Sequence, residues 1–279
     1  MKFGICNEMF EGWKIEDVFA CAADLGYDGV EIAPFTLADS VTEVPSDVRR
    51  RIRAAAAAQG IEIIGLHWLL VKPEGLYINH PDEAIRRRTQ DYLIQLIHFC
   101  GDLGGRVMVC GSPKQRNVLE GDTFEATWER TVEVFRVCAE VAAERAVTLC
   151  IEPLTAKETN FIRTKDEGVR LVQAVNHPNF QLMLDVKAMC GSETKPLPQV
   201  IEEAAPFLRH VHANDANLLG PGMGDTDFRP LAEALHRIGY SGYVSVEVFD
   251  FTPGPEYIAR RSLAYLKEVF AGNGHADSR

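Results

Sequence analysis

The sequence predicts an α/β protein in which eight strands and eight helices alternate and close into a single barrel. Short apolar runs rich in β-branched residues alternate with helical patterns along the chain, in units of roughly 35 residues, which is typical of β/α repeats. The runs are apolar throughout, as expected for parallel strands buried on both faces. The chain has 279 residues, and about 250 residues are typical of such a barrel.

The elements follow one another closely and leave no room for a second domain. The expected strands are the apolar runs at 2–6, 29–33, 61–67, 107–111, 147–151, 180–184, 210–213 and 244–248. The expected helices, several of them ended by Gly or Pro, cover 15–25, 45–58, 82–103, 123–143, 165–175, 198–205, 228–238 and 256–270. We therefore assign 1–271 to one (β/α)₈ TIM barrel and 272–279 to a flexible polar C-terminal tail.

A doubly wound open sheet is the alternative that the same alternation allows. Such a fold normally carries a glycine-rich nucleotide-binding turn after an early strand. The segment 7–12, which follows the first strand, does not match G-x-G-x-x-G. The closed barrel is therefore the preferred prediction.

Composition and charge restrict the partners and the location. A net charge of -11 disfavours binding to nucleic acid through its phosphates. No apolar run reaches the ~20 residues of a membrane span, and the first ten residues do not resemble a signal peptide. Seven cysteines without a C-x-x-C pair indicate buried free thiols in a reducing compartment. We expect a cytoplasmic protein with a small-molecule substrate, no nucleic-acid or membrane partner, and a capacity to form a homo-oligomer.

Acidic residues and one histidine gather where four consecutive predicted strands end. They are Glu152, Asp185, His212 and Glu247, and the C-terminal strand ends carry the active site of this fold. Three facing carboxylates cannot all stay ionised without a cation. One divalent ion held by all four side chains would remove the repulsion, and these ligands suit Mn²⁺, Mg²⁺ or Co²⁺ and admit Zn²⁺. The alternative is a network of salt bridges at the barrel rim.

Five further residues near the strand ends are candidates for contact with a substrate. Core packing is the alternative for His67, Trp68 and His210. His210 is also a candidate for a residue that supports the metal ligands from behind. An ordinary surface position is the alternative for Lys187. The glutamate lies on the loop after the fifth strand. The candidates are His67, Trp68, Glu158, Lys187 and His210.

The segments around these residues form a pattern that resembles a known family. The segments are IEPL at 151–154, LDVKAM at 184–189, HVHAND at 210–215 and VEVF at 246–249. They resemble the xylose isomerase-like TIM barrels, which include sugar phosphate isomerases and epimerases, ketose 3-epimerases, inosose dehydratases and endonuclease IV. The resemblance extends from the first strand to the last helix.

The resemblance implies roles for individual residues. One Mn²⁺- or Mg²⁺-like ion would bind the four predicted ligands, and Glu152 and Glu247 would act as acid and base on opposite faces of a ketose. Glu158 matches the glutamate that contacts the sugar end in ketose 3-epimerases. Two positions depart from that pattern, because Ala188 and Leu218 stand where those enzymes carry a histidine and an arginine at the carbonyl end of the sugar. Simple ketose 3-epimerisation would then depend on a substitute such as Lys187.

These observations predict a divalent-metal-dependent isomerase or epimerase that acts on a sugar or another small polyhydroxy carbonyl compound. A metal on the carbonyl and the adjacent hydroxyl stabilises an enediolate, and the two glutamates move the protons. A lyase or dehydratase acting on a keto sugar or inosose would share the first step. Endonuclease IV-like DNA repair is a remote alternative, since that site uses three zinc ions and more histidines, and a non-enzymatic metal-binding module is another.

Overall fold

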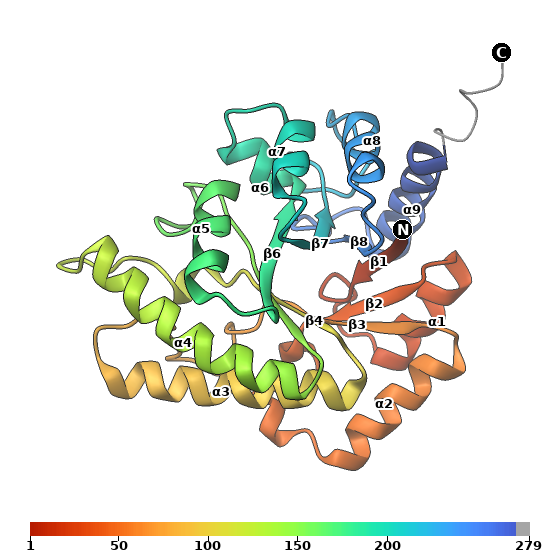
Figure 1. Ribbon diagram of the computed structural model, residues 1–279. Helices are drawn as coiled ribbons and strands as arrows, with labels where there is room; N and C mark the ends of the chain where they lie inside the picture. The colour runs from red at the N-terminus through yellow and green to blue at the C-terminus, as the bar shows by residue number, and fades with distance from the viewer. Residues whose placement is uncertain (272–279) are drawn as a thin grey trace.

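A computed structural model, which describes residues 1–271, confirms the predicted barrel. Its eight strands are parallel and hydrogen-bonded in chain order, and β1 pairs with β8 to close the sheet (Figure 1). The strands are β1 (Lys2–Cys6), β2 (Gly29–Ile32), β3 (Glu62–Leu66), β4 (Val107–Cys110), β5 (Thr148–Ile151), β6 (Phe180–Asp185), β7 (Leu208–Ala213) and β8 (Tyr243–Val246). The tail predicted at 272–279 lies outside the described residues.

Nine α-helices in the described part of the chain surround the sheet. They are α1 (Ile15–Leu25), α2 (Ser46–Ala58), α3 (Glu83–Leu103), α4 (Phe124–Glu144), α5 (Lys165–Val175), α6 (Val186–Ser192), α7 (Leu197–Ala204), α8 (Arg229–Arg237) and α9 (Pro255–Ala271). Three short 3₁₀ turns, at Pro34–Thr36, Val41–Glu43 and Pro113–Gln115, lie in loops at the ends of strands or before helices. Only α6 was not expected from the sequence. Among residues 1–271, no helix is both long enough and apolar enough to span a bilayer.

Side-chain caps and left-handed glycines define where the helices begin and end. The side chains of Asp82, Thr123 and Thr164 accept hydrogen bonds from backbone N–H groups in the first turns of α3, α4 and α5, which are the groups that a helix leaves without partners. Gly26 and Gly104 end α1 and α3 at a φ of 89°, a conformation that favours glycine. These local signals explain why the predicted bounds of the helices agree with the structure.

The large hydrophobic core lies between the sheet and the helices. Phe135 of α4 packs on Phe180 of β6 with ring centroids 4.5 Å apart, and both side chains are buried. A separate small apolar cluster contains Val109, Cys150 and Met183 from β4, β5 and β6. Because strand side chains alternate between faces, residues two positions after Cys150 and Met183 project to the same side as this cluster.

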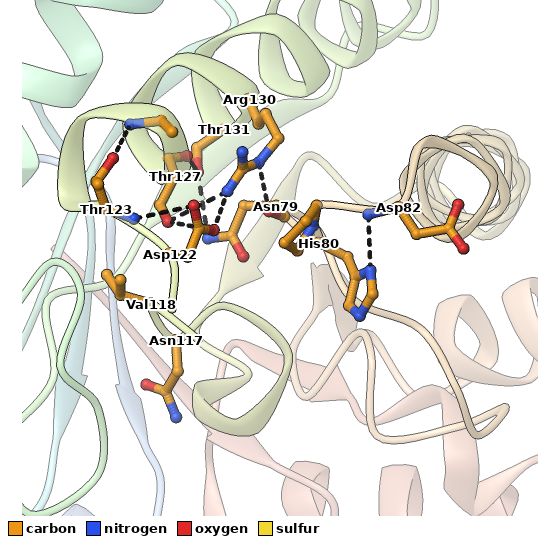
Figure 2. Close-up of polar contacts among 12 residues, drawn as sticks. Asn79, His80, Asp82, Asn117, Val118, Asp122, Thr123, Thr127, Arg130 and Thr131 are labelled. Carbon is orange, nitrogen blue, oxygen red and sulfur yellow. Dashed lines mark hydrogen bonds and ion pairs between the residues drawn. The ribbon is translucent and has the colours of Figure 1, made fainter. Parts of the chain in front are cut away.

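A polar network holds the loop after β3 against the loop after β4 (Figure 2). Arg130 of α4 donates through Nε to the carbonyl of Asn79 at 2.8 Å and forms an ion pair with Asp122. The amide of Asn79 donates to the carbonyl of Arg116 at 2.7 Å and to the hydroxyl of Thr131 at 3.3 Å. Both loops also contribute residues to the site described below, Trp68 from the first and Gly111 from the second.

Candidate metal centre

The four predicted metal ligands converge at the C-terminal end of the barrel. One ligand atom from each of Glu152, Asp185, His212 and Glu247 lies within 4.8 Å of the others. Asp185 and His212 are opposite each other in the β6–β7 register, while Glu152 and Glu247 directly follow β5 and β8. Ligands across an ion with bonds of about 2.0–2.4 Å are at most about 4.8 Å apart. The arrangement therefore has the size and the chemistry of a single divalent-cation site.

The buried carboxylates repel one another, which is visible in the acidity of Glu152. Its exposed fraction is 5%. Burial, followed by the neighbouring charges of Glu247 and Asp185, raises the pKa of Glu152 from 4.5 to about 8. A group of this kind is stabilised either by a proton or by a cation. The electrostatics of the centre therefore favour a bound positive charge.

Glu152 has space for its carboxylate because the residue that follows β4 is a glycine, Gly111. A Cβ atom on Gly111 would lie 1.8 Å from Oε2 of Glu152, far inside the contact distance of two atoms. A larger residue at position 111 would collide with the Glu152 carboxylate in this position, so the carboxylate would have to shift. No role for this glycine was expected from the sequence, although it is the last residue of the strand predicted at 107–111.

Asp185 is held by two hydrogen bonds that leave little freedom to its carboxylate. Its Oδ1 accepts from the backbone N–H of Ala188 at 2.7 Å and so caps α6, and its Oδ2 accepts from the amide of Asn214 at 2.5 Å. Asn214 also accepts from the backbone N–H of Lys187 at 2.8 Å and is fully buried. Such outer contacts orient metal ligands and tune their affinity. Asn214 belongs to one of the motifs in the sequence, but no role was predicted for it.

A buried chain of charges orients His212. Its Nδ1 lies 3.1 Å from Oε2 of Glu247, and its Nε2 lies 3.0 Å from Oε1 of Glu31. The other oxygen of Glu31 lies 2.7 Å from Nε2 of His210. Burial opposes ionisation of Glu31, but His210 and His212 hold the pKa of this carboxyl well below its usual range. An ionised Glu31 favours a proton on Nε2 of His212, which leaves Nδ1 free to bind a cation.

His210 therefore lies behind the metal centre rather than in front of it. It is 1% exposed and its ring centroid is 5.1 Å from that of His212. The residues that line the hollow beside the centre include Glu152, Glu158, Glu247, Trp68 and Phe249 but not His210. Its contact with a substrate stays a prediction, and the geometry favours a supporting position.

Lys187 and Glu158 are brought together next to the metal centre. The ammonium of Lys187 donates to Oε1 of Glu158 at 2.8 Å and lies 3.8 Å from the ring centroid of Phe249. Lys187 is only 7% exposed, so it is not an ordinary surface lysine. Burial opposes its charge, but Asp185 and Glu158 raise the pKa of Lys187. The site thus contains a positive group that can donate to a carbonyl or hydroxyl oxygen.

His67 forms a buried pair with a residue that was not predicted from the sequence. Its Nε2 lies 2.6 Å from Oε2 of Glu8, and one ligand atom from each of Glu8, His67 and Glu247 lies within 4.8 Å of the others. Glu8 comes two residues after the end of β1, a position at which the fold places functional groups, so the available signal was its place in the chain. Trp68 follows β3 and packs edge to face on Phe249 with centroids 6.3 Å apart.

A family model for the xylose isomerase-like TIM barrel matches residues 19–269 of this chain. The chain belongs to the xylose isomerase-like TIM barrel family. The D-psicose 3-epimerase of Ruminiclostridium cellulolyticum is 30% identical over 258 residues, covering 89% of this chain and 84% of that protein. The 3-dehydro-D-guloside 4-epimerase of Escherichia coli is 25% identical over 282 residues, which cover 96% of this chain and 99% of that protein. A crystal structure of D-psicose 3-epimerase with D-tagatose from Clostridium cellulolyticum H10 superposes with a TM-score of 0.86 at 26% identity, covering 97% and 99%.

The two positions at which the sequence resemblance indicated a departure contribute no polar side chain in this xylose isomerase-like chain. Ala188 is buried and supplies only its backbone N–H, which Asp185 accepts. Leu218 is 43% exposed, and its carbonyl accepts from the backbone N–H groups of Phe249 at 2.9 Å and Asp250 at 3.1 Å. Leu218 therefore supports the loop after β8, and Lys187 supplies a buried positive charge beside the centre.

Proposed function

We propose that this protein is a divalent-metal-dependent epimerase of a ketose or another keto sugar, and that it works through an enediolate. The observation that carries the proposal is the convergence of Glu152 and Glu247 with Asp185 and His212 at the ends of consecutive strands. The relatives named above support the same chemistry, since their names describe sugar 3- and 4-epimerases. Mn²⁺ or Mg²⁺ suits the three carboxylates and one imidazole best, and Co²⁺ or Zn²⁺ could replace it.

The two glutamates are the groups we assign to proton transfer. A divalent ion held by the four ligands would supply charge that stabilises the enediolate oxygens and acidifies the carbon-bound hydrogen. Glu152 or Glu247 removes the proton from the carbon beside the carbonyl, and the other returns a proton from the opposite face. Glu31 orients His212 so that its Nδ1 lies 3.1 Å from Oε2 of Glu247, and both atoms could bind the same ion.

Lys187 and Glu158 are the groups we assign to holding the sugar. Lys187 donates to Glu158 and can donate a further hydrogen bond to a substrate oxygen, because an ammonium carries three N–H groups. In the family pattern described in the sequence analysis, Lys187 would take over part of the role of the histidine and arginine that this chain lacks. Trp68 and Phe249 supply apolar walls on the same hollow.

Elimination of water is not part of the proposal. A lyase would share the proton abstraction, but both relatives carry the names of epimerases and give elimination no support. The net charge of -11 also disfavours the phosphate contacts of DNA repair.

Exchange of hydrogen for deuterium during turnover tests the proposal. The protein with Mn²⁺ and a panel of ketoses and keto sugars in D₂O should produce an epimer that carries deuterium at one carbon beside the carbonyl. Glu152→Gln and Glu247→Gln should each lower turnover by a factor on the order of 10² or more, since general acid–base catalysis contributes that much. A product lighter by water, or turnover that survives both substitutions, would contradict it.

A further inference from the structure

We propose that the substrate is a keto sugar that carries a neutral ring as a substituent, and that this ring binds in an aromatic groove beside the metal centre. The inference rests on the proposed function and adds a substrate class to it. The aromatic groove is a hollow of about 600 Å³ at the mouth of the barrel. Its aromatic side chains are Phe10, Trp13, Phe35, Trp68 and Phe251.

The groove continues the site instead of forming a separate one. Trp68 lines both the groove and the hollow beside Glu152 and Glu247. That inner hollow measures only about 30 Å³, far less than the groove. Ligand sites are commonly about 300–1,000 Å³, and the volume of the groove falls within this range. A sugar reacting at the metal centre would therefore lie with its distal part directed into the groove.

Two of the aromatic side chains in the groove are accessible to solvent. Trp13 and Phe35 are each 37% exposed, and Phe10 packs edge to face on Trp13 at 5.3 Å. Among the described residues the exposed large hydrophobic side chains are Trp13, Phe35, Val137, Leu218 and Tyr257. Exposed aromatic faces next to a site typically mark a binding surface for an apolar ring face.

Two buried polar atoms at the inner end of the groove have no hydrogen-bond partner within the described chain. They are Oε1 of Glu8 and Nε1 of Trp68, and the Glu8 side chain is 5% exposed. An unpaired buried acceptor or donor is unfavourable, so such atoms point to a ligand. Trp68 also adopts a φ of 52°, a strained conformation typical of functional positions. Hydroxyl groups can satisfy atoms of both kinds, since a hydroxyl donates to a carboxylate and accepts from an indole N–H.

The charge of the groove excludes an anionic substituent. Its charged lining residues are Glu8 and Glu11, and no Lys, Arg or His among the described residues contributes to the lining. A phosphate or carboxylate on the sugar would meet only like charge there, which is repulsive. A glycosyl ring combines an apolar face for the aromatic side chains with hydroxyls for Glu8 and Trp68, and is neutral. These three properties together specify the substituent.

Three ketoses that differ only at one oxygen test the inference. D-fructose, its 6-O-glucosyl derivative isomaltulose and D-fructose 6-phosphate should be compared by kcat/KM and, for ligands not turned over, by affinity for the Mn²⁺-loaded protein. The kcat/KM or affinity for isomaltulose should exceed that for fructose by on the order of tenfold. The value for fructose 6-phosphate should be lower than that for fructose. If no ketose or keto sugar of the wider panel exchanges deuterium, the proposed function fails, while the order of affinities of these three ketoses still decides the inference.

Substitutions in the groove complete the test. Trp13→Ala and Phe35→Ala should each reduce the ratio of the kcat/KM or affinity for isomaltulose to that for fructose. The double substitution should bring this ratio to about one. Tyr257→Ala removes an exposed aromatic side chain outside the groove and should leave the ratio unchanged. Glu11→Lys should raise the value for fructose 6-phosphate several-fold. A wild-type ratio at or below one, or a ratio that survives the double substitution in a folded protein, would overturn the inference.

Discussion

Single residues decide the geometry of the centre through contacts that a sequence does not display. Gly111 is required because Oε2 of Glu152 occupies the volume of its missing Cβ. Asn214 holds Asp185, and Glu31 holds His212. These three residues contact predicted ligands from other strands, and their roles follow from the packing of the barrel.

Substitution of Gly111 by alanine should weaken metal binding without preventing folding. The added methyl group would displace the Glu152 carboxylate, so affinity for Mn²⁺ should fall by a factor on the order of ten or more. Isothermal titration calorimetry measures it. Gly121→Ala is a matched control, since its φ of 81° makes alanine strained while no heavy atom lies within 4 Å of the added Cβ. Equal affinities of the two variants would contradict this role.

The secondary-structure elements position the site in two ways, through the residues at the ends of strands and through contacts between strands across the barrel. Strand ends could be predicted closely because apolar runs and following Gly or Pro residues are local signals, and the convergence of Glu152, Asp185, His212 and Glu247 could be predicted because they lie at those ends. Helix α6 was missed since it has only seven residues and begins at a capping aspartate that also serves as a predicted ligand. The pair of Glu31 and His210 joins β2 to β7 across 179 positions of sequence, which no local pattern predicts.

The link between β2 and β7 should matter for metal affinity more than for folding. Glu31→Gln keeps the shape but removes the charge that orients His212, so affinity for Mn²⁺ should fall about 10–100-fold. Equilibrium dialysis followed by elemental analysis measures this. Glu62→Gln on β3, which breaks an exposed ion pair with Lys2, should bind the ion as the wild type does. An unchanged affinity in Glu31→Gln would show that the link is only structural.

At the C-terminal end of the barrel, the candidate metal centre and the aromatic groove are built by largely different strand ends. The predicted ligands come from β5 to β8, while the aromatic groove is built by the segments that follow β1, β2, β3 and β8. This division explains how the centre could keep one chemistry while the groove selects the substrate. It also explains why the sequence predicts a candidate metal centre but no particular substrate, because the groove residues form no motif with regular spacing.

Burial of the carboxylates should make stability depend on pH in a definite direction. The folded form keeps a proton on Glu152 up to about pH 8, whereas the unfolded form loses it near 4.5, so the metal-free protein should lose stability as pH rises across this interval. Excess Mn²⁺ should counteract the loss because the ion takes the place of the proton. Calorimetric Tm values with EDTA and with Mn²⁺ test this, and Glu152→Gln should weaken the pH dependence. A Tm of the metal-free protein that rises between pH 4.5 and about pH 8 would contradict this prediction.

The central claim is that four side chains hold one divalent ion, and direct titration with Mn²⁺ tests it. Electron paramagnetic resonance of free Mn²⁺ should show one tight site per chain in the wild type. Asp185→Asn and His212→Ala should each remove that site while circular dichroism shows an intact fold, and Tyr257→Ala should retain it. A folded wild-type protein that binds no Mn²⁺, Mg²⁺, Co²⁺ or Zn²⁺, or that binds one ion equally well after both substitutions, would contradict the claim.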